Sequence, residues 1–229
     1  MENYLELDRV SAIERADFYK KTYAHVAGGV LFFILVITLF LNTPVIRDFA
    51  LSLTQGKMWF LMLGGFMLAT TFAEKMAINS HEKNKQYLGF GIYIVAEAFI
   101  FIPLIYIALN ASGGENLIMQ AAIVTLSLFA GLSSVVFFTG KDFSFMKTGL
   151  MVGGFIALGL IAAGLLFGFD LGLWFSVGMV VLAGGTILYQ TSNLVHRYST
   201  DQYVAAALGL FASLMLLFWY ILRIFLSRD

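Results

Sequence analysis

The chain has 229 residues, of which 60% are hydrophobic and only 12% are charged, and its formal net charge is zero. Soluble domains are nearer to half apolar and a quarter charged, so this composition excludes a water-soluble globular fold and indicates that lipid is the solvent. No basic tract exceeds two adjacent residues, which excludes a nucleic-acid partner. The chain has no cysteine, which excludes disulfides, thiolate metal sites and a cysteine nucleophile.

The N-terminal segment 1–23 is rich in charged residues and lacks the apolar stretch of a cleavable signal peptide. We expect the first apolar run to serve as the membrane-targeting signal instead. Segment 1–23 is therefore predicted to be a cytoplasmic segment of its own. A helix lying on the membrane surface and a solvated tail are both open for it.

Seven apolar runs follow, each long enough to cross a bilayer as a helix, which takes about 20 residues. Short connectors make neighbouring helices antiparallel. The runs are continuous, whereas the strands of a membrane β-barrel alternate in hydrophobicity over about ten residues. The sequence predicts an all-α integral membrane protein with a seven-helix transmembrane domain at 24–226. The runs are 24–42, 58–78, 87–109, 117–138, 148–168, 172–194 and 203–226.

Basic residues indicate the orientation in the membrane. With a cytoplasmic N-terminus, nine of the 14 basic residues lie inside and four outside, and Lys75 lies near the inner end of the second run. Because basic residues accumulate in cytoplasmic loops, this distribution favours an N-terminus inside and, for seven helices, a C-terminus outside. Arg223 and Arg228 oppose an outside C-terminus, so a last segment that re-enters the membrane stays open as an alternative.

Small residues recur at the spacing of close helix packing. Glycine lets two helices approach closely, and we expect these positions to serve packing within the chain rather than a dedicated dimer face. The glycines are the Gly-xxx-Gly pairs Gly149/Gly153 and Gly164/Gly168, and the doublets Gly64-Gly65 and Gly184-Gly185.

Glu97 lies midway through the third run. Burying a charge there costs on the order of 3 kcal/mol or more, so the carboxylate must be paired, protonated or facing water. It is either a functional acid on an ion path or a neutral group that ties helices together by hydrogen bonds. Pro103, six residues later, is expected to kink the helix and to help open a cavity. Glu74 and Lys75, near the inner end of the second run, are expected to pair locally or to reach the membrane surface.

One pattern suggests an enzyme. Ser133 in the fourth run and His196 after the sixth could form a Ser–His dyad, if the hydroxyl reaches the imidazole. Both lie at cytoplasmic helix ends, and the second glycine of a Gly-x-Ser-x-Gly turn is missing. A serine in a membrane helix ordinarily bonds to its own helix. We predict no enzyme, no cofactor and no metal centre, with an intramembrane serine hydrolase as a third alternative.

The C-terminal part resembles the signature of the Bax inhibitor-1 (TMBIM) family. Residues 187–197 read ILYQTSNLVHR, 201–208 read DQYVAAAL and 210–218 read LFASLMLLF. The connector 139–145, TGKDFSF, resembles the family's loop between helices four and five, and 93–103 is most similar to its YccA-like bacterial branch. The resemblance covers most of 20–226. It implies six helices around a central seventh and a location in a bacterial inner membrane.

The resemblance also identifies a departure. In this family two buried aspartates, one on helix six and one on helix seven, share a proton and gate a pH-sensitive calcium leak. Here Gln190 and Ser213 stand at those positions, and neither can titrate or attract a divalent cation as a carboxylate does. We expect the two to face each other, with Glu97 in a separate site that provides any remaining pH response.

Two functions are predicted as alternatives. The first is a cation leak, with Ca²⁺ as the ion that the resemblance implies, along a path lined by Glu97, Gln190, Ser213 and Asp201. The second is a non-transporting protein that binds and regulates another membrane protein in quality control. In both cases the lipid bilayer is a partner and nucleic acid is not.

Overall fold

The structure is a computed structural model that describes residues 11–79 and 82–227. In this part of the chain it contains eight α-helices and a short 3-10 helix, and no strand. Seven of the helices are long and apolar enough to cross a membrane, which confirms the prediction of an all-α, seven-helix membrane protein. They are α2 (Ala12–Asn42), α4 (Trp59–Asn79), α5 (Lys83–Asn110), α6 (Gly114–Thr139), α7 (Met146–Phe167), α8 (Gly172–His196) and α9 (Tyr203–Leu226).

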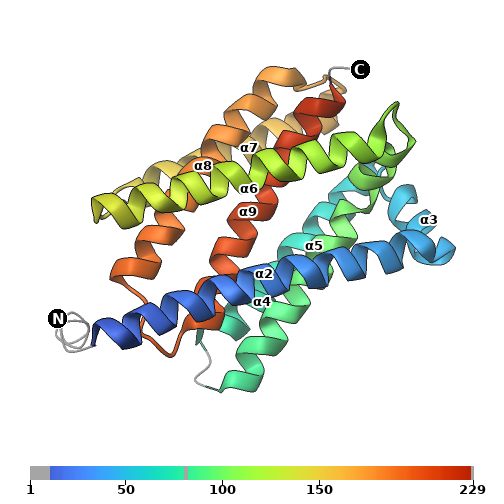
Figure 1. Cartoon of the computed structure of the whole chain (residues 1–229). Helices are drawn as coiled ribbons and strands as arrows, with labels where there is room; N and C mark the ends of the chain where they lie inside the picture. Colours follow the sequence, from blue (N-terminus) through green and yellow to red (C-terminus); the bar gives the residue numbers. More distant parts are fainter. Residues whose placement is uncertain (1–10, 80–81, 228–229) are drawn as a thin grey trace.

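Helix α9 lies at the centre of the bundle (Figure 1). In its most apolar stretch 78% of the residues are buried, against 11% for α7. It packs against α2, α4, α5, α6 and α8, while α7 packs mainly on α8 at the outside. Apolar residues of α9 are fully enclosed, which confirms the expected central seventh helix. Among them are Leu208, Leu210, Phe211, Leu217 and Leu222.

Helix α2 begins earlier than the apolar run does. Ser11 and Glu14 form a capping box: the Ser11 hydroxyl accepts from the Glu14 N–H, and the Glu14 carboxylate accepts from the Ser11 N–H. Residues 12–23 thus continue the first membrane helix, where the sequence suggested a surface helix or a tail. Phe18 and Thr22 are buried in the bundle, so the charges of this segment interrupt the hydropathy but not the helix. The rest of the predicted segment lies outside the described residues.

The first connector contains helical structure that the sequence analysis did not predict. Helix α3 (Pro44–Ser52) and the 3-10 helix η1 (Gly56–Met58) fill it. Pro44 stands at the start of α3, where a missing N–H costs nothing. Ala50 is fully buried and α3 packs on α2 and α5, so this connector is part of the packed domain.

Some of the predicted packing glycines lie at helix contacts and others do not. A β-carbon on Gly185 would lie 2.8 Å from Leu150 on α7, and one on Gly153 would lie 2.4 Å from Leu182 on α8. Gly168 instead ends α7 with a φ of +74°. A β-carbon on Gly64, Gly65 or Gly149 would meet nothing within 4 Å.

The orientation in the membrane stays a prediction that reporter fusions can test. The α5–α6, α6–α7 and α7–α8 connectors lie between antiparallel helices and contain residues 112, 142 and 170. We expect fusions at these three sites to read outside, inside and outside, because the basic residues favour a cytoplasmic N-terminus. The opposite readings at all three sites would invert the assignment.

Candidate functional site

A cavity of about 690 Å³ lies between α4, α5, α7, α8 and α9. Its lining on α4 extends from Trp59 to Glu74, fifteen residues or about 22 Å along a helix, which is most of the roughly 30 Å apolar layer of a bilayer. Asp170, in the loop between α7 and α8, also lines it, and its side chain is 85% exposed. The cavity therefore reaches the surface at the side where α9 ends, called the C-terminal side below.

Glu97 lies on the α5 wall of this cavity and is only 6% exposed. It shares that wall with Tyr93, Ile100 and Phe101, and the spacing of four, three and one residues is that of one helical face. Tyr93, one turn earlier, interacts with the Glu97 carboxylate. The acid that the sequence singled out thus belongs to an internal space and not to the lipid-facing surface.

Glu74 is a second acid on the same cavity, which the sequence analysis did not select. It lies on the α4 face that also presents Trp59, Leu63 and Phe66, at helical spacing. Lys75, the partner expected from the sequence, is exposed and is not part of the lining. The helical periodicity of α4 could have identified this acid, because Glu74 shares a face with large apolar residues while Lys75 lies on another.

Gln190 on α8 and Ser213 on α9 line the same cavity. They meet at Gly209: a β-carbon there would lie 2.9 Å from Gln190 Oε1, and the Ser213 hydroxyl donates to the Gly209 carbonyl at 2.9 Å. The two positions therefore lie around one small residue. All three side chains border the same cavity, and the expectation that Glu97 acts as a separate site stays a prediction.

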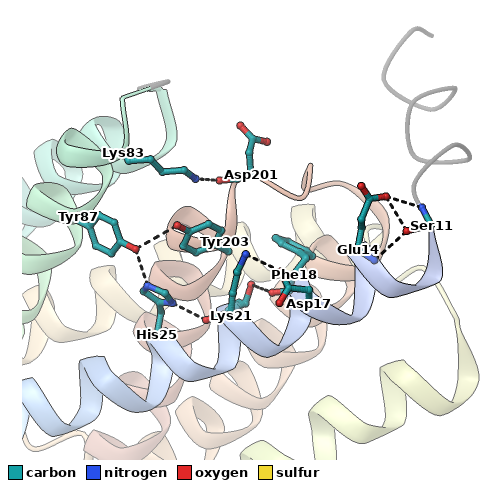
Figure 2. Close-up of polar contacts among 11 residues, drawn as sticks. Ser11, Glu14, Asp17, Phe18, Lys21, His25, Lys83, Tyr87, Asp201 and Tyr203 are labelled. Carbon is teal, nitrogen blue, oxygen red and sulfur yellow. Dashed lines mark hydrogen bonds and ion pairs between the residues drawn. The ribbon is translucent and has the colours of Figure 1, made fainter.

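Asp201 does not line the cavity. It lies in the α8–α9 loop, where its carbonyl accepts from the Lys83 ammonium (Figure 2). Its carboxylate accepts from the Ser199 hydroxyl. The Lys83 ammonium also lies 4.1 Å from the centre of the Tyr203 ring, a cation–π distance. Asp201 thus fixes the loop to the start of α5, and the predicted role on the ion path has no support from its position.

A group of polar side chains joins α2, α5 and α9 next to this loop (Figure 2). His25 Nδ1 contacts the Lys21 carbonyl at 2.7 Å, and His25 Nε2 contacts the Tyr87 hydroxyl at 3.0 Å. The Tyr87 and Tyr203 hydroxyls lie 3.4 Å apart. These contacts join α2, α5 and α9 on the side of the bundle where α9 begins, called the N-terminal side below.

Buried apolar residues lie on that N-terminal side of the bundle. Leu194 of α8 and Val204 of α9 are fully buried where the two helices meet. Tyr198 in the α8–α9 loop packs on the core, and burial raises its pKa to about 12, with Tyr189 and Glu74 nearby adding to the effect. Tyr198 of the loop therefore lies near Glu74, which lines the cavity.

The connector 139–145 is held on the end of α8 by Asp142. The Asp142 carboxylate accepts from the Ser144 N–H at 2.8 Å and from the Ser192 hydroxyl at 3.1 Å, and Ser192 accepts in turn from the Phe143 N–H. Arg197 lies 3.9 Å away. The Ser144 N–H bond is the main reason that the pKa of Asp142 lies below its ordinary value of 3.8, although slight burial opposes the shift.

This shift predicts a pH-dependent stability. A carboxylate whose pKa is depressed by folding stabilises the folded state above its ordinary pKa, and the contribution disappears as pH falls through the folded value. We expect Asp142→Asn to cost about 1 kcal/mol near neutral pH, the ordinary contribution of such bonds. Thermal unfolding in detergent should show a gap between wild type and variant at neutral pH that closes below pH 3.8. An equal gap at all pH values would contradict the assignment.

Ser133 and His196 do not form a dyad. The Ser133 hydroxyl lies 3.4 Å from the Thr191 hydroxyl, and His196 Nδ1 contacts the carbonyl of Ser192 on its own helix at 3.0 Å. No hydrogen bond joins the serine to the histidine within residues 11–79 and 82–227. The hydroxyl thus lacks the base that a nucleophilic serine requires.

Comparison with known proteins identifies the family. The family profile described as "Inhibitor of apoptosis-promoting Bax1" matches residues 15–229. Protein LIFEGUARD 4 of Arabidopsis thaliana is 29% identical over 94% of this chain and 86% of its own length. The uncharacterized protein PA2604 of Pseudomonas aeruginosa is 35% identical over 54% of this chain and 55% of its own length. The modulator of FtsH protease YccA of Escherichia coli is 34% identical over 57% of this chain and 60% of its own length. The chain belongs to the Bax inhibitor-1 family.

Proposed function

We propose that the cavity is part of a cation pathway and that the chain is a cation leak, with Ca²⁺ as the candidate ion. The observation that carries the proposal is the buried Glu97 carboxylate on the wall of a cavity that also contains Glu74. Intramembrane acids facing a cavity mark ion and proton routes. Gln190 and Ser213 add neutral oxygens to the same cavity, and oxygen is the ligand that Ca²⁺ takes.

The balance of charge in the cavity supports a cation. Its described lining contains the carboxylates Glu74, Glu97 and Asp170 and one cationic side chain, Arg223. Arg223 lies 3.7 Å from Asp170 at the C-terminal side, so the charges of these two residues cancel each other. The two glutamates face a space with low-dielectric walls, where a positive ion would pair with their ionised form and favour it over the neutral acid.

Conduction requires the N-terminal side to open. The α8–α9 loop is held on that side by the Lys83–Asp201 contact and packs on the core through Tyr198. We therefore assign the closed state of the leak to this arrangement. Asp201 takes part through the loop that it anchors, and Gln190 and Ser213 through the wall that they form.

Calcium flux into liposomes tests the pathway. We expect Glu97→Gln to lower the flux at least about tenfold, because removing a buried charge that stabilises the ion costs more than 1.4 kcal/mol. Glu115→Gln is the matched control, since it removes the same charge from an exposed position at the start of α6. Flux that survives Glu97→Gln unchanged would refute the assignment, and a wild-type protein without flux would refute the leak.

A second function is favoured by the similarity to YccA of Escherichia coli, which is named a modulator of the FtsH protease and an inner membrane protein. We propose that the chain lies in a bacterial inner membrane and regulates a membrane protein of that type. Reconstitution with FtsH and a membrane substrate should then show slower degradation when the chain is present. Unchanged degradation would exclude this partner. If Glu97→Gln abolishes flux but still slows degradation, the two activities are independent.

A further inference from the structure

We propose that the cavity binds a lipophilic ammonium ion, a charged amine attached to an apolar body. The proposal rests on the proposed function in one respect, because both use the cavity around Glu97 as the place that attracts positive charge. It adds the chemical class of a ligand that the walls of the cavity select.

The walls suit an apolar body. The volume of about 690 Å³ lies within the range of small-molecule sites, roughly 300 to 1,000 Å³. Aromatic side chains contribute to the lining, among them Phe101 and Trp219, which pack edge to face at a centroid distance of 4.8 Å. A bare metal ion gains nothing from such surface, whereas an alkyl or aryl group is removed from water there. Aromatic faces also attract an ammonium ion.

The carboxylate suits an ammonium group. Glu97 is 6% exposed and faces this apolar space, and a buried carboxylate is stabilised by a hydrogen-bonded cation. The one cationic side chain of the described lining, Arg223, is with Asp170 at the C-terminal side. Tyr93, the neighbour of Glu97 on α5, carries no positive charge. A ligand ammonium supplies the charge partner that the described wall lacks.

The entrance suits a molecule that arrives from the bilayer. Helices α4 and α7 both line the cavity, and Met67 on α4 belongs to the lining although it is 44% exposed. The cavity is therefore accessible from the lipid-facing side at Met67. Amphiphilic amines concentrate at the bilayer surface, with the apolar body among the acyl chains, in the orientation that a lateral entrance needs.

Tryptophan fluorescence tests the proposal on the full-length protein. The chain has three tryptophans: Trp59 and Trp219 line the cavity, while Trp174 is 83% exposed. Trp174→Phe leaves the two cavity reporters. The quenching probe is an ω-brominated dodecylammonium ion, and the matched uncharged probe is the corresponding brominated dodecanol. We expect saturable quenching by the ammonium probe with an affinity at least about tenfold higher than that of the alcohol.

Three variants separate the effect of the Glu97 charge from the effect of the apolar walls. Glu97→Gln should remove the preference for the ammonium probe, while Glu115→Gln should retain it. Gly154→Leu should weaken quenching by both probes, because a side chain there enters the cavity and a β-carbon meets nothing within 4 Å. Equal affinity for both probes, or a preference that survives Glu97→Gln, overturns the proposal. Ammonium preference without calcium flux would overturn the calcium pathway alone, and calcium flux that needs Glu97 without ammonium preference would overturn this inference alone.

Discussion

Gly89→Ala is expected to lower the stability of the bundle by about 2–3 kcal/mol, the cost of overpacking a tight helix contact. A β-carbon on Gly89 would lie 2.6 Å from the Ala73 carbonyl oxygen and 2.9 Å from the Ala77 nitrogen. Both are backbone atoms of α4, so the clash is relieved only if α4 and α5 move apart. A flexible side chain at the same distance would move aside at lower cost.

The measurement is the midpoint of thermal unfolding in detergent, followed by circular dichroism. Gly91→Ala is the matched control, because it lies two residues along the same helix and its β-carbon would meet nothing within 4 Å. Both variants make the same change in helix propensity, so the difference between them isolates the contact with α4. Equal midpoints for the two variants would show that α4 and α5 are not held this closely.

The effect on function follows from the position of α4. Glu74 lies one residue from Ala73, on the cavity side of that helix. If α4 shifts away from α5, the distance between the Glu74 and Glu97 carboxylates increases. We expect Gly89→Ala to reduce calcium flux even at temperatures where the variant is folded.

The membrane helices could be predicted because each apolar run is long enough to decide its own structure. The centre of the bundle could not be read from hydropathy, since α7 and α9 are similarly apolar although one is exposed and the other enclosed. The family resemblance supplied that arrangement. Helix α3 was missed because a nine-residue helix next to Pro44 reads as a connector, and its packing on α5 depends on tertiary contacts.

The candidate site could be predicted only in part. Glu97 was identified because an acid in the middle of an apolar run is costly wherever it lies. Glu74 was missed because it stands near a helix end beside Lys75, where local pairing explains it equally well. The bonds of Asp201 with Ser199 and Lys83 could not be predicted from the sequence, since they depend on the conformation of the α8–α9 loop.

Restoring the family's acids should have the second large effect. Gln190 and Ser213 both border Gly209, so Gln190→Asp with Ser213→Asp would place two carboxylates close together in an apolar cavity. Two such groups do not both ionise cheaply, and they titrate as a pair. We expect the double variant to gain pH-dependent Ca²⁺ binding, with an affinity at least about tenfold higher at mildly alkaline than at mildly acidic pH.

The single variants provide the first control. Each adds one carboxylate without a partner acid at Gly209, so each should gain much less than the double variant. The added charge can also cost several kcal/mol of stability, and the thermal midpoint of each variant must be measured before its Ca²⁺ affinity is compared. Isothermal titration with Ca²⁺ across neutral pH then gives the affinity directly. A folded, monodisperse double variant without a pH-dependent response would show that the two positions do not act as a pair.

Glu97→Gln in the double variant is the decisive control, because Glu97 borders the same cavity. A further carboxylate in the same low-dielectric space both repels the added pair and helps to bind a divalent ion. Removing it should therefore weaken Ca²⁺ binding by the double variant and change the pH range of the response. If Glu97→Gln leaves that binding and its pH dependence unchanged, Glu97 is electrostatically isolated from Gln190 and Ser213, and the single cation-binding cavity assigned to these residues would have to be divided into two sites.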